Sequence, residues 1–381
     1  MNVGIVTLFD LYNVGNRLQN YAVTSVLQKL GFQCETLVPQ LPPRTPYRQK
    51  VEQETKILLD DDPEQAQAQY PKTCKWLRFK SFTDTYIPWK EVACSQFSNL
   101  ASAYDFIVVG SDQVWNPVFR SSIGQIENHL LAFAPPEKRV CFSPSIGLDD
   151  IPAHLYNIYE KEWCKYRFLS VREQTGAELI KKITGRDAIV VIDPTLMIDK
   201  EEWVSIAKPL PGFDYAQDYI LFYFLGNPEE EISADMRGFL EHERKSKNLQ
   251  LINLFDPNVP FLQSPGPAEI LDLFSHASMV CTDSFHGTVF SILLGKPFLL
   301  ANRILIMRNE KLNMSARTNT LLKKLGLEDH LPGKPIAKSK KQWEDDFARA
   351  YGRLEKEREL ALKFLKVSFC KEKNYENLYI K

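Results

Sequence analysis

Short apolar runs of strand length alternate with segments of helical periodicity along this chain, and this alternation limits its fold more than any other feature. An apolar run within residues 1–9 precedes apolar positions at helical spacing, which end at Gly31, and residues 34–38 form a second strand-like run. Comparable runs recur at residues 104–109, 140–145, 168–171, 188–192, 219–225, 249–255 and 277–281. Strands that alternate with helices form parallel sheets, so the sequence predicts an α/β protein.

The length of the chain and a change of pattern near residue 193 indicate two domains. A chain of 381 residues exceeds the usual size of one hydrophobic core. We expect a Rossmann-like N-terminal domain at residues 1–197 and a Rossmann-like C-terminal domain at residues 198–340, facing each other across a cleft. The stretch at residues 41–84 is rich first in proline and then in Gln, Asp and Glu, and we predict a variable, partly helical excursion there.

The tail at residues 341–381 contains a candidate long amphipathic helix at residues 342–369. Its apolar residues mostly recur every three or four positions, and Glu and Lys alternate on the opposite face. We expect this helix to pack back across the two domains rather than to bind a membrane or a partner protein.

Composition and charge exclude several classes of protein. The formal net charge of −1 provides no global field for nucleic acid or an anionic membrane. The seven cysteines are scattered and never form a CxxC pair, which argues against a zinc site or a disulfide framework and for a reducing compartment. The sequence shows neither a signal peptide nor an apolar stretch long enough to span a bilayer. We therefore expect a cytoplasmic protein without a transmembrane segment. The sequence does not indicate its oligomeric state.

Reactive and anion-binding side chains follow the ends of several predicted strands. Ligands bind at the carboxyl ends of parallel strands, and a helix that starts there offers free N–H groups to an anion. Two further candidates are Arg317, just before a helix expected at residues 320–325, and Glu269, which opens another helix. The structural alternative for each candidate is a helix cap, an Asx turn or a salt-bridged residue. The candidates in the strand-end loops are Asn13, Gly15, Asn16, Ser111, Asp112, Gln113, Arg172, Ser284, Phe285, His286 and Gly287.

Several common sequence motifs are absent. The chain has no GxxxxGK[ST] phosphate loop, no GxGxxG after the first strand and no GxSxG elbow. Histidines other than His286 show no metal-ligand spacing. The sequence therefore gives no support to a phosphate-loop ATPase, a dinucleotide-binding enzyme of the common type or a metal site.

The motifs taken together resemble those of the polysaccharide pyruvyl transferase family. The resemblance keeps its order over about residues 1–335, and the GSDQVWNP and TDSFHG strings are specific in combination. The matching strings are NVGNRLQ at 13–19, GSDQVWNP at 110–117, SVRE at 170–173, VIDPTL at 191–196, GPAE at 266–269 and TDSFHGT at 282–288, followed by Arg317 ahead of LLKKLGL at 321–327.

The resemblance implies a fold, a reaction and a set of partners. The fold would be GT-B-like, with the acceptor side in the first domain, the donor side in the second and the active site in the cleft between them. Phosphoenolpyruvate would donate its three-carbon unit to a sugar as a ketal on two hydroxyls and release phosphate. Family members act on bacterial exopolysaccharides and surface glycoconjugates, and the chemistry requires no metal and no cofactor besides the donor substrate.

Residue chemistry supports roles for three catalytic candidates. Arg172, with Arg317, offers planar donors suited to a phosphate and a carboxylate. His286 is the candidate general acid for the methylene carbon, and Asp112 or Glu269 is the candidate acceptor of the sugar hydroxyl proton. The other candidates are expected to bind donor or sugar.

Two other functions stay open at this stage. One is a GT-B glycosyltransferase that uses a nucleotide-sugar, because the same helix N-terminus would hold a diphosphate. The other is a non-catalytic glycan-binding relative, which the presence of both Arg172 and His286 disfavours. The sequence does not name the acceptor sugar or say whether it is attached to a nucleotide, a lipid or a polymer.

Overall fold

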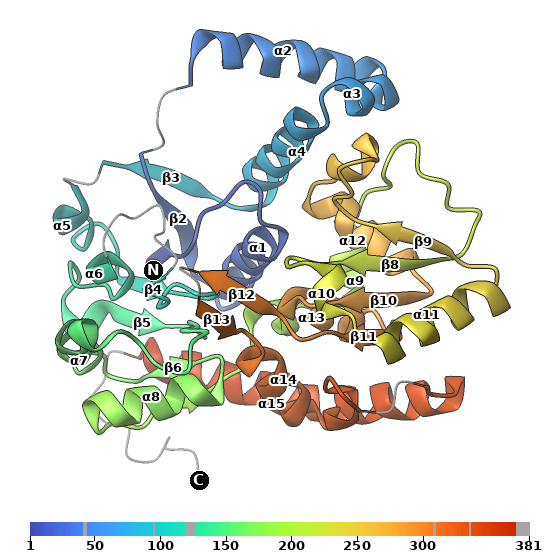
Figure 1. The fold of residues 1–381 in the computed structure, drawn as a ribbon. Helices are drawn as coiled ribbons and strands as arrows, with labels where there is room; N and C mark the ends of the chain where they lie inside the picture. Colours follow the sequence, from blue (N-terminus) through green and yellow to red (C-terminus); the bar gives the residue numbers. More distant parts are fainter. Residues whose placement is uncertain (41–43, 94–95, 119–125, 308–309, 335–336, 371–381) are drawn as a thin grey trace.

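Two parallel β-sheets form the framework of the protein (Figure 1). The computed structural model describes residues 1–40, 44–93, 96–118, 126–307, 310–334 and 337–370. We call the part of the chain up to residue 197 the N-terminal half and residues 198–340 the C-terminal half. The prediction of an α/β protein built on parallel sheets is confirmed.

The sheet of the N-terminal half has the strand order β3-β2-β1-β4-β5, and every neighbouring pair is parallel. Its central strand β1 is buried from Val3 to Val6 because helices cover both faces. β6 (Ser170–Val171) and β7 (Ile189–Val190) form a separate parallel pair. The strands of the main sheet are β1 (Asn2–Val6), β2 (Gln33–Pro39), β3 (Trp89–Val92), β4 (Phe106–Val109) and β5 (Arg139–Cys141).

Helices connect these strands. α1 (Val14–Lys29) begins at an Asn13 cap, whose side chain accepts a hydrogen bond from Asn16 N. The other helices of this half outside the 41–84 excursion are α5 (Phe97–Leu100), α6 (Ile126–His129), α7 (Tyr156–Trp163) and α8 (Gln174–Thr184), with 3₁₀ turns at Pro136–Lys138, Ala153–Leu155 and Pro194–Met197.

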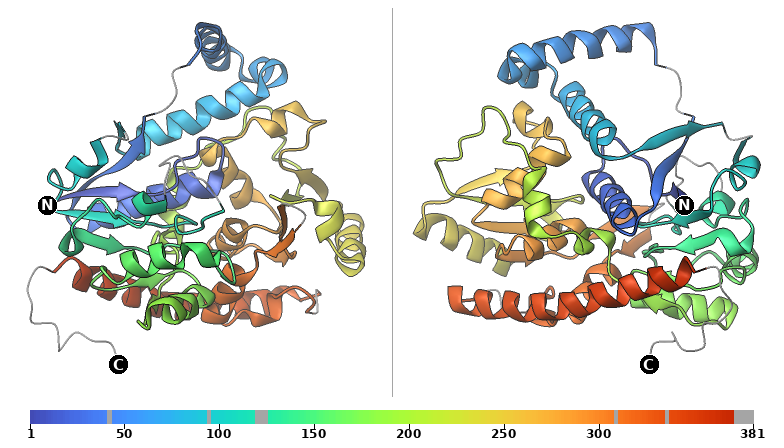
Figure 2. Two further views of the ribbon diagram at one scale, coloured as in Figure 1. Left: turned by 60° about the vertical axis from the view of Figure 1, so that its left-hand side comes forward. Right: turned by 180° about the vertical axis from the view of Figure 1, so that it is seen from behind.

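The predicted excursion is three consecutive helices, apart from residues 41–43, which lie outside the described residues. They are α2 (Pro46–Asp61), α3 (Pro63–Gln69) and α4 (Pro71–Tyr86). Each begins with proline in its first turn, where the missing N–H costs no hydrogen bond. α4 packs against α12 (Pro267–His276) of the C-terminal half, whereas α2 stands away from both sheets (Figure 2).

The sheet of the C-terminal half has the order β11-β10-β8-β9 and is also parallel. β12 (Ile304–Met307) and β13 (Glu310–Asn313) follow β11 and form an antiparallel hairpin. The sequence pattern did not predict this hairpin. The other strands are β8 (Tyr219–Tyr223), β9 (Gln250–Asn253), β10 (Met279–Thr282) and β11 (Phe298–Leu300). The helices are α9 (Lys200–Ser205), α10 (Pro228–Glu231), α11 (Ala234–Ser246), α12 (Pro267–His276), α13 (Phe285–Leu293) and α14 (Ala316–Leu325), with 3₁₀ turns at Pro260–Gln263 and Glu328–His330.

Two predicted helix starts are wrong by about one turn. α13 begins at Phe285 rather than at residue 288, and α14 begins at Ala316 rather than at residue 320. The first turn of each helix carries mainly polar or small residues, so the apolar pattern reveals only the turns that follow. Arg317 therefore lies within the first turn of α14 rather than before the helix.

The long C-terminal helix α15 (Lys340–Ser368) runs across both halves (Figure 2). Near its start Trp343 packs on Phe298 of the C-terminal half, with ring centroids 5.6 Å apart. At its end Phe369 packs on Phe32 of the N-terminal half, with centroids 4.4 Å apart. Midway, Arg358 donates hydrogen bonds to the backbone between the halves, including one of 2.7 Å to Leu196 O.

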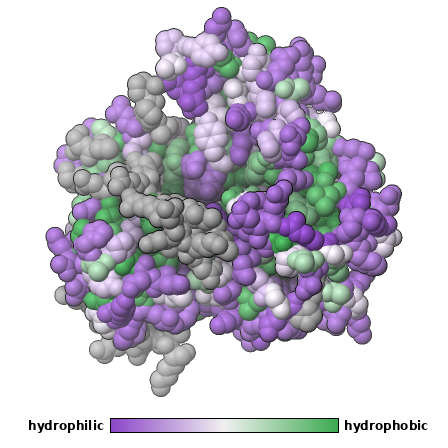
Figure 3. Space-filling view, viewed as in Figure 1, coloured by the Kyte–Doolittle hydropathy of each residue, from purple (hydrophilic) through white to green (hydrophobic). Residues whose placement is uncertain are grey.

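The outer surface is mostly polar on the side shown in Figure 3. Among the helices that the structure describes, none combines the length and the apolar composition needed to cross a membrane. The last part of the predicted tail, residues 371–381, lies outside the described residues.

Candidate active site

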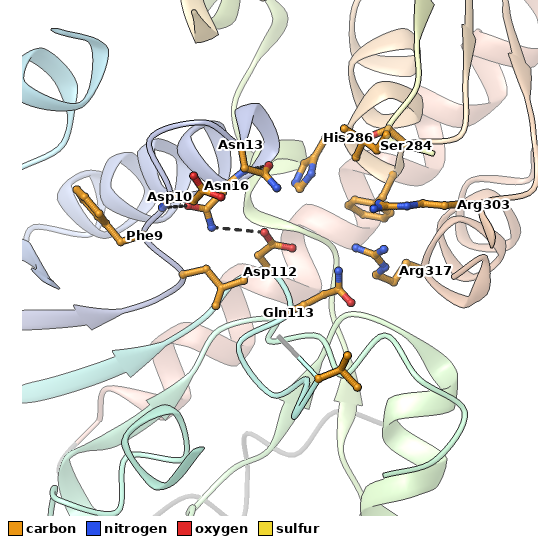
Figure 4. Close-up of a pocket in the computed structure, with 14 residues that line it drawn as sticks. Phe9, Asp10, Asn13, Asn16, Asp112, Gln113, Ser284, His286, Arg303 and Arg317 are labelled. Carbon is orange, nitrogen blue, oxygen red and sulfur yellow. Dashed lines mark hydrogen bonds between the residues drawn. The ribbon is translucent and has the colours of Figure 1, made fainter. Parts of the chain in front are cut away.

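A cavity of about 420 Å³ lies between the two halves, at the carboxyl ends of their strands. The two halves contribute opposite walls, which meet around Asp112 and His286 (Figure 4). The N-terminal wall consists of Leu8, Phe9, Asp10, Asn13, Asn16, Asp112, Gln113 and Val118. The C-terminal wall consists of Leu225, Ser284, Phe285, His286, Arg303 and Arg317.

The N-terminus of α13 forms part of the C-terminal wall. Ser284 is the N-cap, and its Oγ accepts a hydrogen bond of 3.3 Å from Gly287 N. The first N–H groups of a helix have no partner within it, so they give this wall a positive end. Gly287 lets the helix approach β10, because a Cβ there would come within 2.3 Å of Thr282 Oγ1. Asp283 faces away and accepts hydrogen bonds of 2.8 Å from two backbone N–H groups, those of Leu225 and Gly226.

The loop after β4 places Asp112 in the N-terminal wall. Gly110 adopts a φ of +116°, and a Cβ at this position would meet Phe142 O at 2.3 Å, so only glycine fits. Ser111 is buried behind the cavity and donates a 2.6 Å hydrogen bond to Ser143 O. Asn16 Nδ2 reaches Asp112 Oδ2 at 3.5 Å, at the N-terminus of α1.

Arg172 is held between two carboxylates. Its Nη2 lies 3.0 Å from Asp112 Oδ1 and its Nη1 lies 2.6 Å from Asp193 Oδ2, and all three side chains are buried. Burial alone would raise the pKa of Asp112, but the charges of Arg172, His286 and Arg317 outweigh it and lower this pKa to about 2. Burial disfavours the Arg172 charge, yet Asp193 and Asp112 leave its pKa above the ordinary value. Both terminal nitrogens of Arg172 are thus engaged by the protein.

Arg317 differs from Arg172 in that no carboxylate of the described residues is paired with it. Its side chain is buried, and among the residues that the structure describes it has no hydrogen bond and no ion pair. Burial and then the charge of Arg172 lower the pKa of Arg317 to about 10, although Asp112 opposes them. Arg303 lies beside it in the same wall, with Nε 4.0 Å from Asp283 Oδ2. The C-terminal wall therefore presents cationic groups that no carboxylate of the described residues neutralises within hydrogen-bond distance.

His286 lies where the two walls meet. Its Nε2 is buried without a hydrogen-bond partner among the described residues and lies 3.9 Å from Asp193 Oδ1. Burial lowers the pKa of His286; the carboxylates of Asp193 and Asp112 oppose this effect, and Arg172 and Arg317 reinforce it. The imidazole is thus neutral near neutral pH and ready to gain a proton when negative charge arrives.

Comparison with known families adds an independent finding. A sequence profile described as polysaccharide pyruvyl transferase matches residues 13–302. The chain belongs to the polysaccharide pyruvyl transferase family. No curated protein sequence gives a significant match.

Among solved structures, this pyruvyl transferase family member is similar to several sugar-processing enzymes. UDP-GlcNAc 2-epimerase from Neisseria meningitidis, bound to UDP-GlcNAc, has 14% identity and a TM-score of 0.44 over 95% of this chain and 94% of that one. A putative UDP-N-acetylglucosamine 2-epimerase from Listeria monocytogenes has 10% identity and a TM-score of 0.49 over 100% of both chains. A glycosyltransferase from Rickettsia africae has 11% identity and a TM-score of 0.45 over 96% and 99%.

The family member has the expected GT-B-like architecture, in which two parallel-sheet halves face each other across the cavity and a long C-terminal helix crosses back. The structure brings most of the predicted site residues to this cavity. Those that line it directly are Asn13, Asn16, Asp112, Gln113, Ser284, Phe285, His286 and Arg317. Those that lie behind its wall are Gly15, Ser111, Arg172 and Gly287.

Glu269 lies outside this cavity, so the structure does not bring this candidate proton acceptor together with His286. Its carboxylate accepts a 2.9 Å hydrogen bond from Gly266 N, which caps α12, and lies 3.7 Å from Arg78 Nε of α4. It lines a separate cavity of about 710 Å³ beneath the excursion helices. Burial raises the pKa of Glu269, and Arg78 partly offsets this. A carboxylate that opens a helix is favoured by the helix itself, which accounts for its presence.

Sequence reasoning missed several residues of this site in the family member. Asp10 follows β1 and Arg303 follows β11. Both could have been found by the rule that located the other loops, namely that ligands bind at the carboxyl ends of parallel strands. Asp193 stood in the VIDPTL string but was interpreted only as a domain boundary. Within the described part of the chain, no three His, Cys, Asp or Glu side chains are grouped so that they could hold a metal ion.

Proposed function

We propose that this protein transfers the pyruvyl group of phosphoenolpyruvate to two hydroxyls of a sugar as a ketal and releases phosphate, in the synthesis of a bacterial surface polysaccharide or glycoconjugate. The observation that carries the proposal is that buried Arg317, without an anionic partner among the described residues, lines the same cavity as His286. Family membership supports a pyruvyl transfer, and the geometry supports an anionic donor next to an acid.

The donor would bind the C-terminal wall. A buried cation without a partner costs several kcal/mol of folding free energy, so a side chain such as Arg317 is typical of a site that awaits an anion. Phosphoenolpyruvate carries a phosphate and a carboxylate on one small skeleton. Arg317 and Arg303 supply planar donors for these groups, and the N-terminus of α13 supplies backbone N–H groups.

The acceptor would bind the N-terminal wall. Asn13 and Gln113 offer amide groups, and Asp10 offers a carboxylate that no side-chain cation pairs within the described residues. Phe9 adds an aromatic side chain to the same wall, with the Arg17 guanidinium over its ring. Hydroxyl-rich sugars are commonly bound by this combination of hydrogen-bonding groups and an aromatic ring.

The reaction begins with proton transfer from His286 to the methylene carbon of the donor. The electron pair of the C=C bond forms the new C–H bond and leaves an oxocarbenium-like centre at C2. One sugar hydroxyl adds to C2 and loses its proton, the C–O bond to phosphate then breaks, and phosphate leaves with the electron pair. The second hydroxyl adds to the regenerated cation and loses its proton, so one ketal and one phosphate are formed. General acid catalysis of this kind contributes about 10²- to 10⁴-fold.

The electrostatics of the cavity suit this sequence. Anionic phosphoenolpyruvate next to His286 raises the pKa that burial has lowered, so the imidazole gains its proton as the donor binds. Asp112 stays ionised because its pKa is about 2, and it faces the developing positive charge at C2. Such a weak base is sufficient for a hydroxyl that attacks a cation, because the hydroxyl becomes strongly acidic as the bond forms.

The experiment that tests the proposal follows both products. Phosphoenolpyruvate labelled at its methylene carbon is incubated with the protein and with methyl glycosides and nucleotide-linked hexoses, and NMR monitors the methyl group of a ketal while inorganic phosphate is assayed. We expect equal amounts of ketal and phosphate, and neither with the His286→Gln variant. Consumption of a nucleotide-sugar with phosphoenolpyruvate untouched would instead establish glycosyl transfer.

A further inference from the structure

Asp193 is the most heavily bonded carboxylate around the cavity. It is buried at the end of the N-terminal half, where the 3₁₀ turn Pro194–Met197 begins. Its Oδ1 accepts hydrogen bonds from Thr195 N at 2.9 Å and Thr195 Oγ1 at 2.6 Å. Its Oδ2 accepts from Arg172 Nη1 at 2.6 Å, and Ser111 Oγ lies 3.1 Å from the same oxygen. Three donors from its own half, with the Ser111 hydroxyl beside them, therefore fix the position of this carboxylate.

His286 reaches the same carboxylate from the C-terminal half. Its Nε2 lies 3.9 Å from Asp193 Oδ1, within ion-pair distance, and is buried without any hydrogen bond in the described part of the structure. The charged groups that face the imidazole are Asp193, Asp112, Arg172 and Arg317. Asp193 is the one carboxylate in this group for which an ion-pair distance to His286 is observed within the described residues.

The other ring nitrogen, Nδ1, lies against α1. A Cβ built on Gly15 would stand 2.1 Å from His286 Nδ1, so the glycine leaves this nitrogen uncovered at the position where a side chain would block it. Since the buried Nε2 faces Asp193, Nδ1 is the nitrogen left for a group in the cavity. The two nitrogens thus have different surroundings, which fixes the tautomer of a neutral imidazole.

We propose that Asp193 is a positioning residue that holds the Nε2–H of His286, so that Nδ1 carries the proton that is given to the substrate. The pairing stands on the geometry alone, whereas the use of that proton rests on the proposed function. A carboxylate beside Nε2 stabilises the imidazolium and orients the ring, as an outer-shell carboxylate does for a histidine that binds a metal.

The pair also connects the two halves. Asp193 belongs to the N-terminal half and His286 to the C-terminal half, and 3.9 Å exceeds hydrogen-bond distance. At this distance the carboxylate acts on the ring through its charge, across the boundary between the halves.

Nitrogen-15 NMR of the full chain with labelled histidine tests the tautomer directly, without donor or acceptor. The resonances of His286 are assigned by their loss in His286→Gln. We expect the neutral ring to carry its proton on Nε2, which is seen as a protonated-type Nε2 shift and an unprotonated-type Nδ1 shift. A proton on Nδ1 of the neutral ring in the wild-type protein would overturn the proposal.

A pH titration of the same His286 resonances tests whether the charge of Asp193 raises the pKa of His286. Asp193→Asn should lower the apparent pKa of His286 by about one unit or more, because a neighbouring carboxylate within about 4 Å favours the charged form. Ser111→Ala removes the hydroxyl 3.1 Å from Asp193 Oδ2 but leaves the charge of Asp193 in place, so its His286 titration should stay close to that of the wild type. An unchanged titration in folded Asp193→Asn would contradict the proposal. If the wild-type pair is observed and phosphoenolpyruvate has no effect, the proposed function fails and the pairing stands.

Discussion

Gly15 and His286 are in such close contact that a methyl group on Gly15 would stand 2.1 Å from Nδ1 and 2.8 Å from Cε1 of the imidazole. The glycine belongs to the first turn of α1, and the histidine to the first turn of α13. Two helix N-termini from opposite halves thus meet at one ring, and the position of the ring depends on the absence of a side chain on the other helix.

We expect Gly15→Ala to displace His286 and to lower activity about 100-fold or more, since a misplacement of about 1 Å in a catalytic group has an effect of this size. Donor binding should be largely retained, because Arg317 and Arg303 keep their positions. Steady-state kinetics, with donor binding measured by calorimetry, check this prediction. Gly352→Ala in α15 is the matched control: nothing lies within 4 Å of its added methyl group, so activity should be unchanged. Full activity in Gly15→Ala would show that the ring tolerates displacement.

Arg317→Met is predicted to stabilise the empty protein while removing the response to phosphoenolpyruvate. The substitution takes away a buried charge without an anionic partner in the described structure, and the gain in the free energy of unfolding should be roughly 1–3 kcal/mol. Denaturant unfolding with and without the donor measures both effects. Lower stability together with an intact donor response would mean that Arg317 serves the fold instead of the ligand.

Arg172→Met provides the contrast. This arginine neutralises the buried carboxylates of Asp112 and Asp193, so its loss should reduce the free energy of unfolding by about 3–5 kcal/mol. The same denaturant experiment compares the two variants. If Arg172→Met and Arg317→Met changed the free energy of unfolding equally, the distinction between an arginine paired with carboxylates and one without an anionic partner would be contradicted.

The affinity for phosphoenolpyruvate should increase as the pH falls from 8 towards 6. Burial lowers the pKa of His286, so it binds a proton only when the anion arrives or when the pH falls. Isothermal calorimetry in buffers of different ionisation enthalpy should show proton uptake on binding. His286→Gln should lose that uptake and flatten the pH dependence; uptake that persists in this variant would assign the proton to another group.

Acid stability should depend on Asp112. Its pKa in the folded protein is about 2, against an ordinary value of 3.8, so its contribution is fully present above pH 3.8 and is lost as the pH falls towards 2. The contribution is about 2 kcal/mol. The free energy of unfolding of Asp112→Asn, measured by urea unfolding at several pH values, should therefore change less between pH 4 and pH 2 than that of the wild type. Equal slopes for the two proteins would be inconsistent with the ion pair to Arg172.

The parts of the site that could be predicted share one physical rule. His286, Asp112 and Asn13 were found because ligands gather at the carboxyl ends of parallel strands, which can be located from short apolar runs. Glu269 illustrates the weakness of a local signal, since a carboxylate in the first turn of a helix serves as a cap as readily as it binds a substrate. Asp193 precedes a proline and resembles a turn residue in sequence, while its partners lie 21 and 82 residues away in the chain.

In the fold, too, local sequence signals left two features unpredicted, the packing of the helical excursion and the β12–β13 hairpin. A proline in the first turn marks the start of α2, α3 and α4, but nothing local indicates that α4 packs on α12 of the other half. The apolar pattern predicts starts of α13 and α14 that are about one turn too late, although a cap at Ser284 was among the alternatives and is observed. These features depend on tertiary packing between segments that are far apart in the chain, and a single sequence does not reveal such contacts.

The most direct test of a phosphoenolpyruvate-binding site formed by Arg317 and His286 is thermal unfolding with and without that compound. At about 100 times its dissociation constant the donor should add roughly 2.7 kcal/mol to the free energy of unfolding of the wild type. We predict this stabilisation for the wild type, its loss in Arg317→Gln and a reduced effect in His286→Gln. Stabilisation by a uridine nucleotide or a nucleotide-sugar, with no response to phosphoenolpyruvate, would contradict the proposed function and point to glycosyl transfer.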